Sequence, residues 1–356
     1  MTSARAFVFP GIRSRVVFGS GTLAQLASEM DRLGRKRALL LATPQQRKDV
    51  EALADRLGSA TAGVFAGAVM HTPVNVTRAA IAAFEQSRAD CVIALGGGSS
   101  IGLGKAIALR TGADQIAIPT TYAGSEMTDI LGETSGGEKT TRRDPAILPE
   151  TVIYDVDLSL TLPKEMTVSS GLNAIAHAAE ALYAADRNPI LSLMAADAIR
   201  AFASALPAIL ANPAAKSARA DALYGAWLCG AVLGGVSMAL HHMLCHTLGG
   251  GFDTPHAQTH AILLPHTIGF NAAAVGDLLK PVSDALGGAT PGKALHRFAA
   301  RLDAPTRLRD LGLTESDLDR AAAIAARNPY FNPRPFGMAE IRTVLQDAWA
   351  GTEPPF

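Results

Sequence analysis

Short apolar runs alternate with amphipathic stretches from the N-terminus to Asp157, and this alternation restricts the fold more than any other feature. The runs expected to be strands cover residues 15–18, 37–42, 62–65, 91–95 and 115–118. Apolar residues recur at three- and four-residue spacing, as in amphipathic helices, over residues 22–33, 45–57, 74–87 and 100–110. Because the strands are apolar throughout, the pattern predicts an α/β domain with a mostly parallel sheet covered on both faces.

After Leu158 the periodicity is helical alone, and no strand is expected beyond Asp157. Helices are predicted over residues 168–184, 190–210, 217–248, 277–286, 294–302, 316–326 and 338–350. We therefore expect an α/β domain over residues 1–158 and an all-α domain over residues 159–356. A chain of 356 residues, 48% hydrophobic and 18% charged, is large and apolar enough for two folded domains.

Charge and composition argue against several classes of protein. The 32 Lys and Arg balance the 32 Asp and Glu, so no nucleic-acid partner is expected. The strictly apolar stretch 226–240 has 15 residues, fewer than the ~20 that cross a membrane. Cys91, Cys229 and Cys245 form no CxxC motif, which favours a reducing compartment. Because the N-terminus also lacks a signal-peptide pattern, we expect a cytoplasmic protein with no membrane partner.

A glycine-rich loop follows the strand predicted at 91–95. Gly96, Gly97 and Gly98 stand between that strand and the next helix, and Ser99 comes directly after them. Glycine lets the backbone approach a ligand, and a helix N-terminus offers free N–H groups to a phosphate. The loop therefore predicts a pyrophosphate site, although glycines also serve a simple tight turn.

Three hydroxyl side chains, Thr120, Thr121 and Ser125, follow the next predicted strand. Nucleotides bind at the carboxyl edge of open α/β sheets, where these hydroxyls would emerge. We predict that they complete the cofactor site; capping and turn formation are their alternative roles. The strand at 37–42 is not followed by an acidic residue that would bind a ribose hydroxyl, so the cofactor is expected to be NADH or NADPH.

Histidines are concentrated in one part of the helical half. Six of the nine fall within 26 residues, where a uniform scatter gives fewer than one: His241, His242, His246, His256, His260 and His266. His177 lies one helical turn after Asn173, so the two share a helix face. A single buried histidine is usually a hydrogen-bonded core residue, but six together favour an active site. Asn173 is a weak ligand for a hard divalent cation, so the residues favour a histidine-lined pocket without a strong metal site.

Together these motifs resemble the iron-containing (group III) alcohol dehydrogenases over nearly the whole chain. The matching segments are Gly96-Gly97-Gly98-Ser99, Pro119-Thr120-Thr121, Gly171-Leu172-Asn173-Ala174 with His177, His242-Met243-Leu244-Cys245-His246 and Thr254-Pro255-His256. The resemblance implies a dehydroquinate synthase-like fold, in which an NAD(P)-binding domain precedes an all-α domain and hydride transfer occurs in the cleft between them. It also implies a homodimer, for which Phe7–Val17 is the candidate strand that pairs across subunits.

The metal site of that family uses one Asp and three His. The resemblance maps it onto Asn173, His177, His242 and His256, so the carboxylate is missing from this chain. Gly102 also replaces an Asp that the family usually has after its glycine loop. Because of these two departures, we expect no bound metal.

Segments 96–105, 121–128 and 139–145 are similar to the maleylacetate reductase branch of the family. That branch reduces the carbon–carbon double bond of maleylacetate to give 3-oxoadipate, in bacterial degradation of aromatic compounds. It uses NADH or NADPH and is regarded as not needing a metal. The resemblance therefore implies a small dicarboxylate substrate.

A dianionic substrate needs cations and hydrogen-bond donors. Lys139, Arg142 and Arg143 are predicted to bind its carboxylates; surface ion pairs are the commoner role for such a run. Asn173 and His241 are further candidate substrate contacts.

The catalytic roles are assigned to four histidines. His177, His242 and His256 are expected to donate hydrogen bonds to a carboxylate or to the enolate oxygen. His246 is the predicted general acid, with His241 as its alternative.

Three competing interpretations stay open. A metal-dependent alcohol dehydrogenase would use the oxygen of Asn173 as a ligand and would lose activity under a chelator. A lyase of the dehydroquinate-synthase type would consume no net NADH. A nucleotide-binding sensor would bind the cofactor without turnover, and its histidines would be structural.

Overall fold

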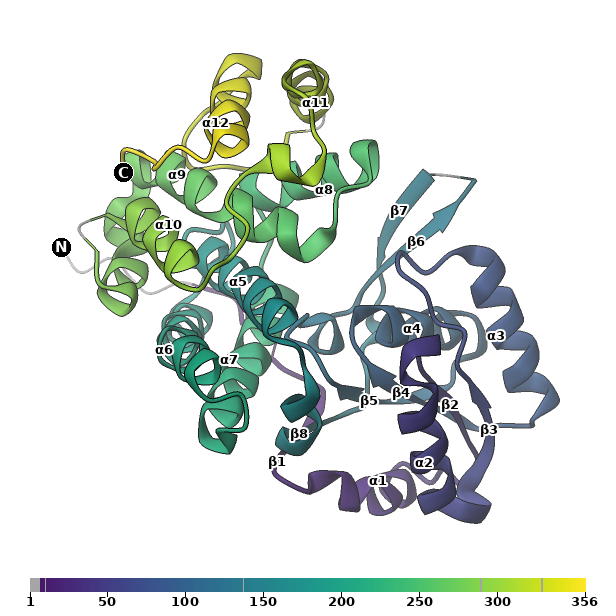
Figure 1. Ribbon diagram of the computed structural model, residues 1–356. Helices are drawn as coiled ribbons and strands as arrows, with labels where there is room; N and C mark the ends of the chain where they lie inside the picture. The colour runs from purple at the N-terminus through teal and green to yellow at the C-terminus, as the bar shows by residue number, and fades with distance from the viewer. Residues whose placement is uncertain (1–6, 10, 137, 289, 328) are drawn as a thin grey trace. The chain divides into compact units, whose positions relative to one another are not determined.

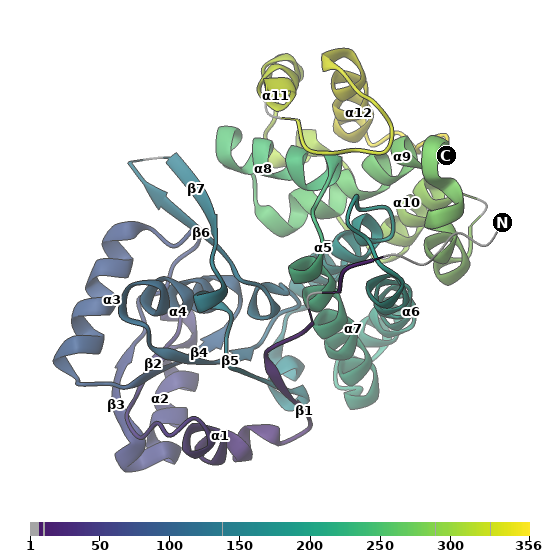
Figure 2. The same ribbon diagram turned by 180° about the vertical axis from the view of Figure 1, so that it is seen from behind.

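The computed structural model describes residues 7–9, 11–136, 138–288, 290–327 and 329–356, which divide into two compact units (Figures 1 and 2). One unit spans Ile12–Leu162, and the other spans Pro163–Phe356 with the described residues before Ile12. The sequence had assigned those first residues to the α/β domain. They group with the helical unit instead, where Asn188 Nδ2 donates a hydrogen bond to Val8 O at 3.3 Å.

Six parallel strands form the sheet of the first unit, in the order β1-β8-β5-β4-β2-β3. Their bounds are β1 Arg15–Gly19, β2 Ala38–Leu41, β3 Thr61–Phe65, β4 Cys91–Gly96, β5 Asp114–Pro119 and β8 Thr151–Asp155. Side chains alternate along β2: Leu40 packs with the cluster that includes residues of α1 and α2, whereas Leu39 and Leu41 pack with α3 and α4. The predicted parallel sheet with helices on both faces is therefore confirmed.

The helices of this unit are α1 Leu26–Arg32, α2 Arg47–Leu57, α3 Val74–Gln86 and α4 Gly98–Thr111. Three strands were not predicted: β8 and the antiparallel hairpin of β6 Ile130–Ser135 and β7 Glu138–Arg143. The expected strand at Phe7–Val17 is also displaced. The strand begins at Arg15 and pairs with β8 of the same chain, where Val16 faces Val152.

The second unit is helical, as predicted. Its helices are α5 Lys164–Ala181, α6 Pro189–Ala211, α7 Lys216–Gly235, α8 Leu240–Phe252, α9 His256–Leu286, α10 Pro291–Arg301, α11 Glu315–Arg327 and α12 Met338–Ala350. Among the described residues, Pro189–Ala211 is long and apolar enough to cross a membrane, as is the segment His256–Arg301 that contains α9 and α10, and α7 and α8 also pass this test if they are taken together. In this fold α6 packs against α5 and α7, and α9 packs against α5 and α10.

The single helix predicted over 217–248 is wrong, because the chain bends by 94° between α7 and α8. Val236 adopts extended dihedrals, and the Asp186 carboxylate accepts hydrogen bonds from Ser237 N at 2.9 Å and from Ser237 Oγ at 2.8 Å. This capping interaction releases the chain from helical geometry. The bend starts α8 in a new direction immediately before His241 and His242.

Candidate active site

Two glycines between the end of β4 and the start of α4, Gly96 and Gly97, lack room for a side chain. Gly96 has a φ of +139°, and a Cβ there would lie 2.5 Å from Gln46 Oε1 and from Ser100 Oγ. A Cβ on Gly97 would lie 2.9 Å from Thr121 Oγ1. Since α4 begins at Gly98 without a side-chain cap, its first N–H groups suit a phosphate.

The loop after β5 is hydrogen-bonded to the glycine-rich loop. Thr120 N donates to Gly96 O at 3.0 Å, and Thr120 Oγ1 accepts from Gln46 Nε2 at 3.1 Å. The structure thus brings together the glycines, Thr120 and Thr121 that the sequence assigned to the cofactor.

Ser125 is tied instead to Lys105, a buried residue of α4 that sequence reasoning did not assign. Lys105 Nζ donates to Ser125 O at 2.5 Å, to Thr128 Oγ1 at 2.9 Å and to Ile130 O at 2.9 Å, and it lies 3.3 Å from Ser125 Oγ. Burial lowers the pKa of Lys105 to about 7. Lys105 therefore anchors the segment 125–130 to α4.

The predicted cationic cluster lies on β7. Arg142 pairs with Asp144 at 3.3 Å and Arg143 with Asp129 at 2.6 Å, and both guanidinium groups are about half exposed or more. The side chain of Lys139 lies outside the described part of the chain. Both described arginines thus form the surface ion pairs considered as their alternative role.

Three helices of the second unit assemble the histidines. Ring centroids lie 5.1 Å apart for His177 of α5 and His242 of α8, and 4.9 Å apart for His242 and His260 of α9. His256 stands 4.4 Å from His260, and His246 stands 6.1 Å from His242. His246 and His256 are exposed, and the other three are buried. The histidines that were predicted to line a pocket therefore form one continuous cluster of imidazoles.

His266, although part of the sequence cluster, lies elsewhere in the unit. Its ring contacts His296 at a centroid distance of 6.2 Å. Burial lowers its pKa to about 3. The sequence analysis grouped His266 with the other histidines only because they lie close together in the sequence.

Glu180 is the functional candidate that the sequence analysis missed. It is fully buried on α5, and its Oε2 accepts from His242 Nδ1 at 2.6 Å and from Ala239 N at 3.0 Å. Its Oε1 accepts from His241 N at 2.8 Å and from Tyr183 Oη at 3.2 Å. Burial would raise the pKa of Glu180, but the hydrogen bond and charge of His242 lower it to about 2. The available signal was an acidic residue one turn after His177, in a segment of α5 that is otherwise mostly alanine.

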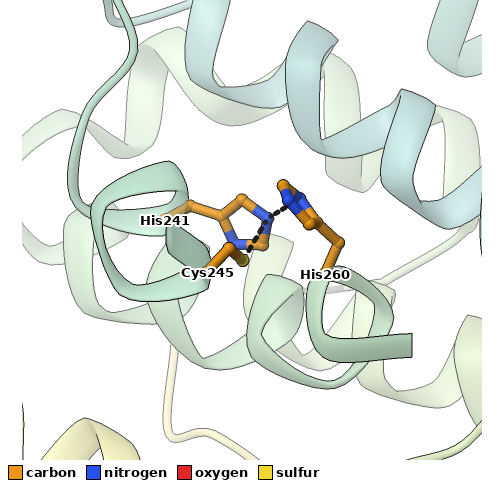
Figure 3. Close-up of side chains that lie close together, drawn as sticks. All are labelled: His241, Cys245 and His260. Carbon is orange, nitrogen blue, oxygen red and sulfur yellow. Dashed lines mark hydrogen bonds between the residues drawn. The ribbon is translucent and has the colours of Figure 1, made fainter. Parts of the chain in front are cut away.

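His241, Cys245 and His260 form a compact buried group between α8 and α9 (Figure 3). His241 Nε2 lies 2.9 Å from His260 Nδ1 and 3.6 Å from Cys245 Sγ. Thr267 Oγ1 donates to Leu263 O, so it accepts from His241 Nδ1 at 3.0 Å. Burial lowers the pKa of His241 to about 3, which makes this ring neutral and its Nε2 an acceptor. His241 therefore links Thr267 on one side of its ring to His260 and Cys245 on the other.

Among the described residues, the buried polar atoms without a hydrogen-bond partner include Asn173 Oδ1, His177 Nδ1, His242 Nε2 and His260 Nε2. Burial, followed by the neighbouring imidazoles, lowers the pKa of His177 well below its usual range. Unsatisfied buried polar atoms cost free energy, so their occurrence on Asn173 and on the neighbouring rings of His177, His242 and His260 indicates a site that a polar ligand completes.

The donor set does not fit a divalent iron ion. In the part of the chain that the structure describes, one group of His, Cys, Asp or Glu places three ligand atoms within 4.8 Å of one another, and it is His241, Cys245 and His260. His177, His242 and His256 do not converge in this way. Asn173 contributes no negative charge, which hard divalent cations require for tight binding.

Comparison with known proteins identifies related sequences and folds. Residues 13–156 match the family model described as iron-containing alcohol dehydrogenase, and residues 167–349 match the C-terminal model of the Fe-containing alcohol dehydrogenase family. The chain is 57% identical to maleylacetate reductase of Rhizobium sp. (strain MTP-10005), over 98% of this chain and 99% of that protein. It is 52% identical to maleylacetate reductase of Burkholderia cepacia, with the same coverage.

Solved structures of related proteins superpose on nearly the whole chain. Maleylacetate reductase from Agrobacterium tumefaciens superposes with a TM-score of 0.96 at 57% identity, covering 99% of this chain and 100% of that one. An iron-containing alcohol dehydrogenase from Corynebacterium glutamicum superposes with a TM-score of 0.94 at 38% identity, covering 99% of both chains. The likeness in sequence and fold therefore extends across both units.

Proposed function

The chain belongs to the iron-containing alcohol dehydrogenase family, and from this premise we propose that it reduces the carbon–carbon double bond of maleylacetate to give 3-oxoadipate. Relatives at 57% and 52% identity carry the name maleylacetate reductase. The observation that carries the proposal is Asn173, a buried neutral amide with an unpartnered Oδ1 at the position of the family's carboxylate.

The charge of the substrate explains why an amide suits this position. Maleylacetate carries two carboxylates, and a buried Asp would repel them. The amide of Asn173 can turn to present its N–H groups to a carboxylate, which an Asp cannot do. His177 Nδ1 and His242 Nε2, also buried and unpartnered, offer further hydrogen bonds.

In this mechanism Gly96–Gly98 would hold the pyrophosphate of NADH or NADPH, and the bound cofactor would supply the hydride that the alkene carbon β to the ketone accepts. The electron pair of the double bond moves onto the ketone oxygen as an enolate. Imidazole N–H groups of His177, His242 and His256 stabilise that oxygen and bind a carboxylate.

The proton for the carbon next to the ketone comes from His246 in this proposal. His246 is exposed, and its Nδ1 lies 3.2 Å from Tyr330 Oη. An exposed imidazole can recover a proton from water after each turnover. His241 is less suited to this role, because its buried ring is hydrogen-bonded through both nitrogens.

Lys139, Arg142 and Arg143 stay candidates for binding the second carboxylate. The ion pairs of the two arginines are partly exposed, and such pairs contribute only about 0–1 kcal/mol. A dianionic ligand can therefore compete for either guanidinium group. Charge reversal at Arg142 that leaves the KM for maleylacetate unchanged would remove it from this role.

We propose that the reaction needs no metal, because the donors around Asn173 suit an anionic substrate better than a divalent cation. The rival is a metal-dependent alcohol dehydrogenase, in keeping with the name of the family. NADH and NADPH oxidation should be followed with maleylacetate on metal-stripped protein, and NAD(P)⁺ reduction with simple alcohols. Oxidation with maleylacetate alone supports the proposal. Turnover of alcohols that depends on added iron or zinc contradicts it.

The proposal extends to assembly and location. We propose that the protein is cytoplasmic, since Cys91, Cys229 and Cys245 are free thiols. We also propose a homodimer, since Phe7, Val8 and Phe9 expose 47%, 82% and 40% of their surfaces and form an apolar segment that a second copy can cover. Light scattering after size-exclusion chromatography tests the dimer, and a monomeric mass refutes it.

A further inference from the structure

Glu180 has a complete set of hydrogen bonds around a carboxylate with no exposed surface. The donors are the backbone N–H groups of Ala239 and His241, the Tyr183 hydroxyl and the His242 ring. Burying a carboxylate is strongly unfavourable unless it is fully hydrogen-bonded. The fold therefore retains a costly charged group between α5 and the start of α8.

One part of this arrangement is structural. Helix α8 begins at Leu240 without a side-chain cap of its own. Glu180 takes the place of that cap from a different helix, because it accepts the N–H groups of Ala239 and His241. A neutral acceptor could also do this, so the capping role does not explain why the group is charged.

The contact with His242 does explain the charge. An ionised carboxylate only accepts hydrogen bonds, so the 2.6 Å contact requires a hydrogen on His242 Nδ1. His242 Nε2 is then the free ring nitrogen, and it is buried and unpartnered. An amide at position 180 could instead donate to Nδ1, which would reverse the tautomer.

We propose that Glu180 is a positioning residue that acts through His242, an inference that rests on the proposed function. It fixes the ring with Nδ1 toward the carboxylate, and its negative charge stabilises the doubly protonated ring whose Nε2–H donates to the enolate oxygen. The role belongs to the chemical step and not to cofactor binding.

The main test is a double-mutant cycle on the full-length protein with maleylacetate and NADH. We expect Glu180→Gln to lower kcat by about 10- to 100-fold, with an unchanged KM for NADH. In a His242→Asn background the same substitution should lower kcat by less than about twofold, because the residue through which Glu180 acts is already gone. Equal losses in the two backgrounds, or full activity of Glu180→Gln, would overturn the proposal.

Tyr183→Phe is the matched control. It removes another hydrogen bond to the same carboxylate, together with the one that Tyr183 Oη accepts from Asn271, but it leaves the contact with His242 intact. We expect it to keep kcat within about twofold of the wild type while its midpoint of thermal unfolding reports any loss of stability. A loss as large as that of Glu180→Gln would assign the effect to the fold and refute a role through His242.

A measurement on the unmodified protein covers the case in which Glu180→Gln does not fold. Side-chain ¹⁵N NMR, with the His242 signals assigned by His242→Asn, should show a protonated Nδ1. A ring with hydrogen on Nε2 alone would overturn the proposal. This readout needs no substrate, so it stands even if the wild type fails to reduce maleylacetate.

Discussion

Restoring the family carboxylate by Asn173→Asp tests the substrate-binding argument quantitatively. Asn173 exposes 3% of its surface, so an Asp there is screened little by water. At an effective dielectric constant of about 20, two unit charges about 5 Å apart repel each other by about 3 kcal/mol. That repulsion corresponds to more than about a 100-fold loss of affinity for one substrate carboxylate.

The assay is steady-state kinetics at saturating NADH with Asn173→Ala as the control. The Ala variant loses hydrogen bonds but gains no charge, so we expect its KM for maleylacetate to rise by only about 10-fold. The Asp variant should also gain affinity for Fe²⁺ or Zn²⁺, because it regains an anionic ligand. The reasoning is refuted if the KM of the Asp variant rises no more than that of the Ala variant.

Three further predictions concern the cofactor loop, the proton donor and acid stability. Gly97→Ala should weaken NADH binding at least about 10-fold in a fluorescence titration, because the new Cβ would lie 2.9 Å from Thr121 Oγ1. Gly250→Ala should leave NADH binding unchanged, because nothing lies within 4 Å of a Cβ at that position. His246→Ala should lower kcat by about 100-fold or more, and an unchanged rate would exclude it as the acid. Burial lowers the pKa of His241 and of His266 from 6.5 to about 3, so as the pH falls below 6.5 protons bind the unfolded chain first. The free energy of unfolding should therefore fall between pH 6.5 and pH 3, by up to about 1.4 kcal/mol per pH unit for each residue, and urea titrations that give equal values at pH 7 and pH 5 would contradict this.

The strands of the main sheet were predictable where the local sequence is apolar, because such segments are buried in the fold. Leu39–Leu41 is apolar throughout and is buried on both faces. By contrast, β7 reads Glu138–Arg143 and contains no apolar run, because its hairpin lies outside the main sheet. Such a strand is specified by pairing with its neighbour, which periodicity does not reveal.

The prediction of active-site residues was limited for the same reason, because local sequence patterns do not reveal contacts between distant residues. Asn173 and His177 were predictable because their spacing on one helix fixes a shared face. Glu180 was missed because its partners on α8 lie about 60 positions away, and an acidic residue in a helix is ordinarily expected at the surface. His266 was wrongly grouped with the pocket because α9 directs it toward His296.

The central claim is that an amide at position 173 has made this pocket a binding site for a dianion in place of a metal. The most direct measurement is the rate of NADH oxidation with maleylacetate, together with the metal content of the same sample, before and after exhaustive chelation. We predict full activity with far less than one metal ion per chain. Loss of activity under the chelator that iron or zinc restores would contradict the account.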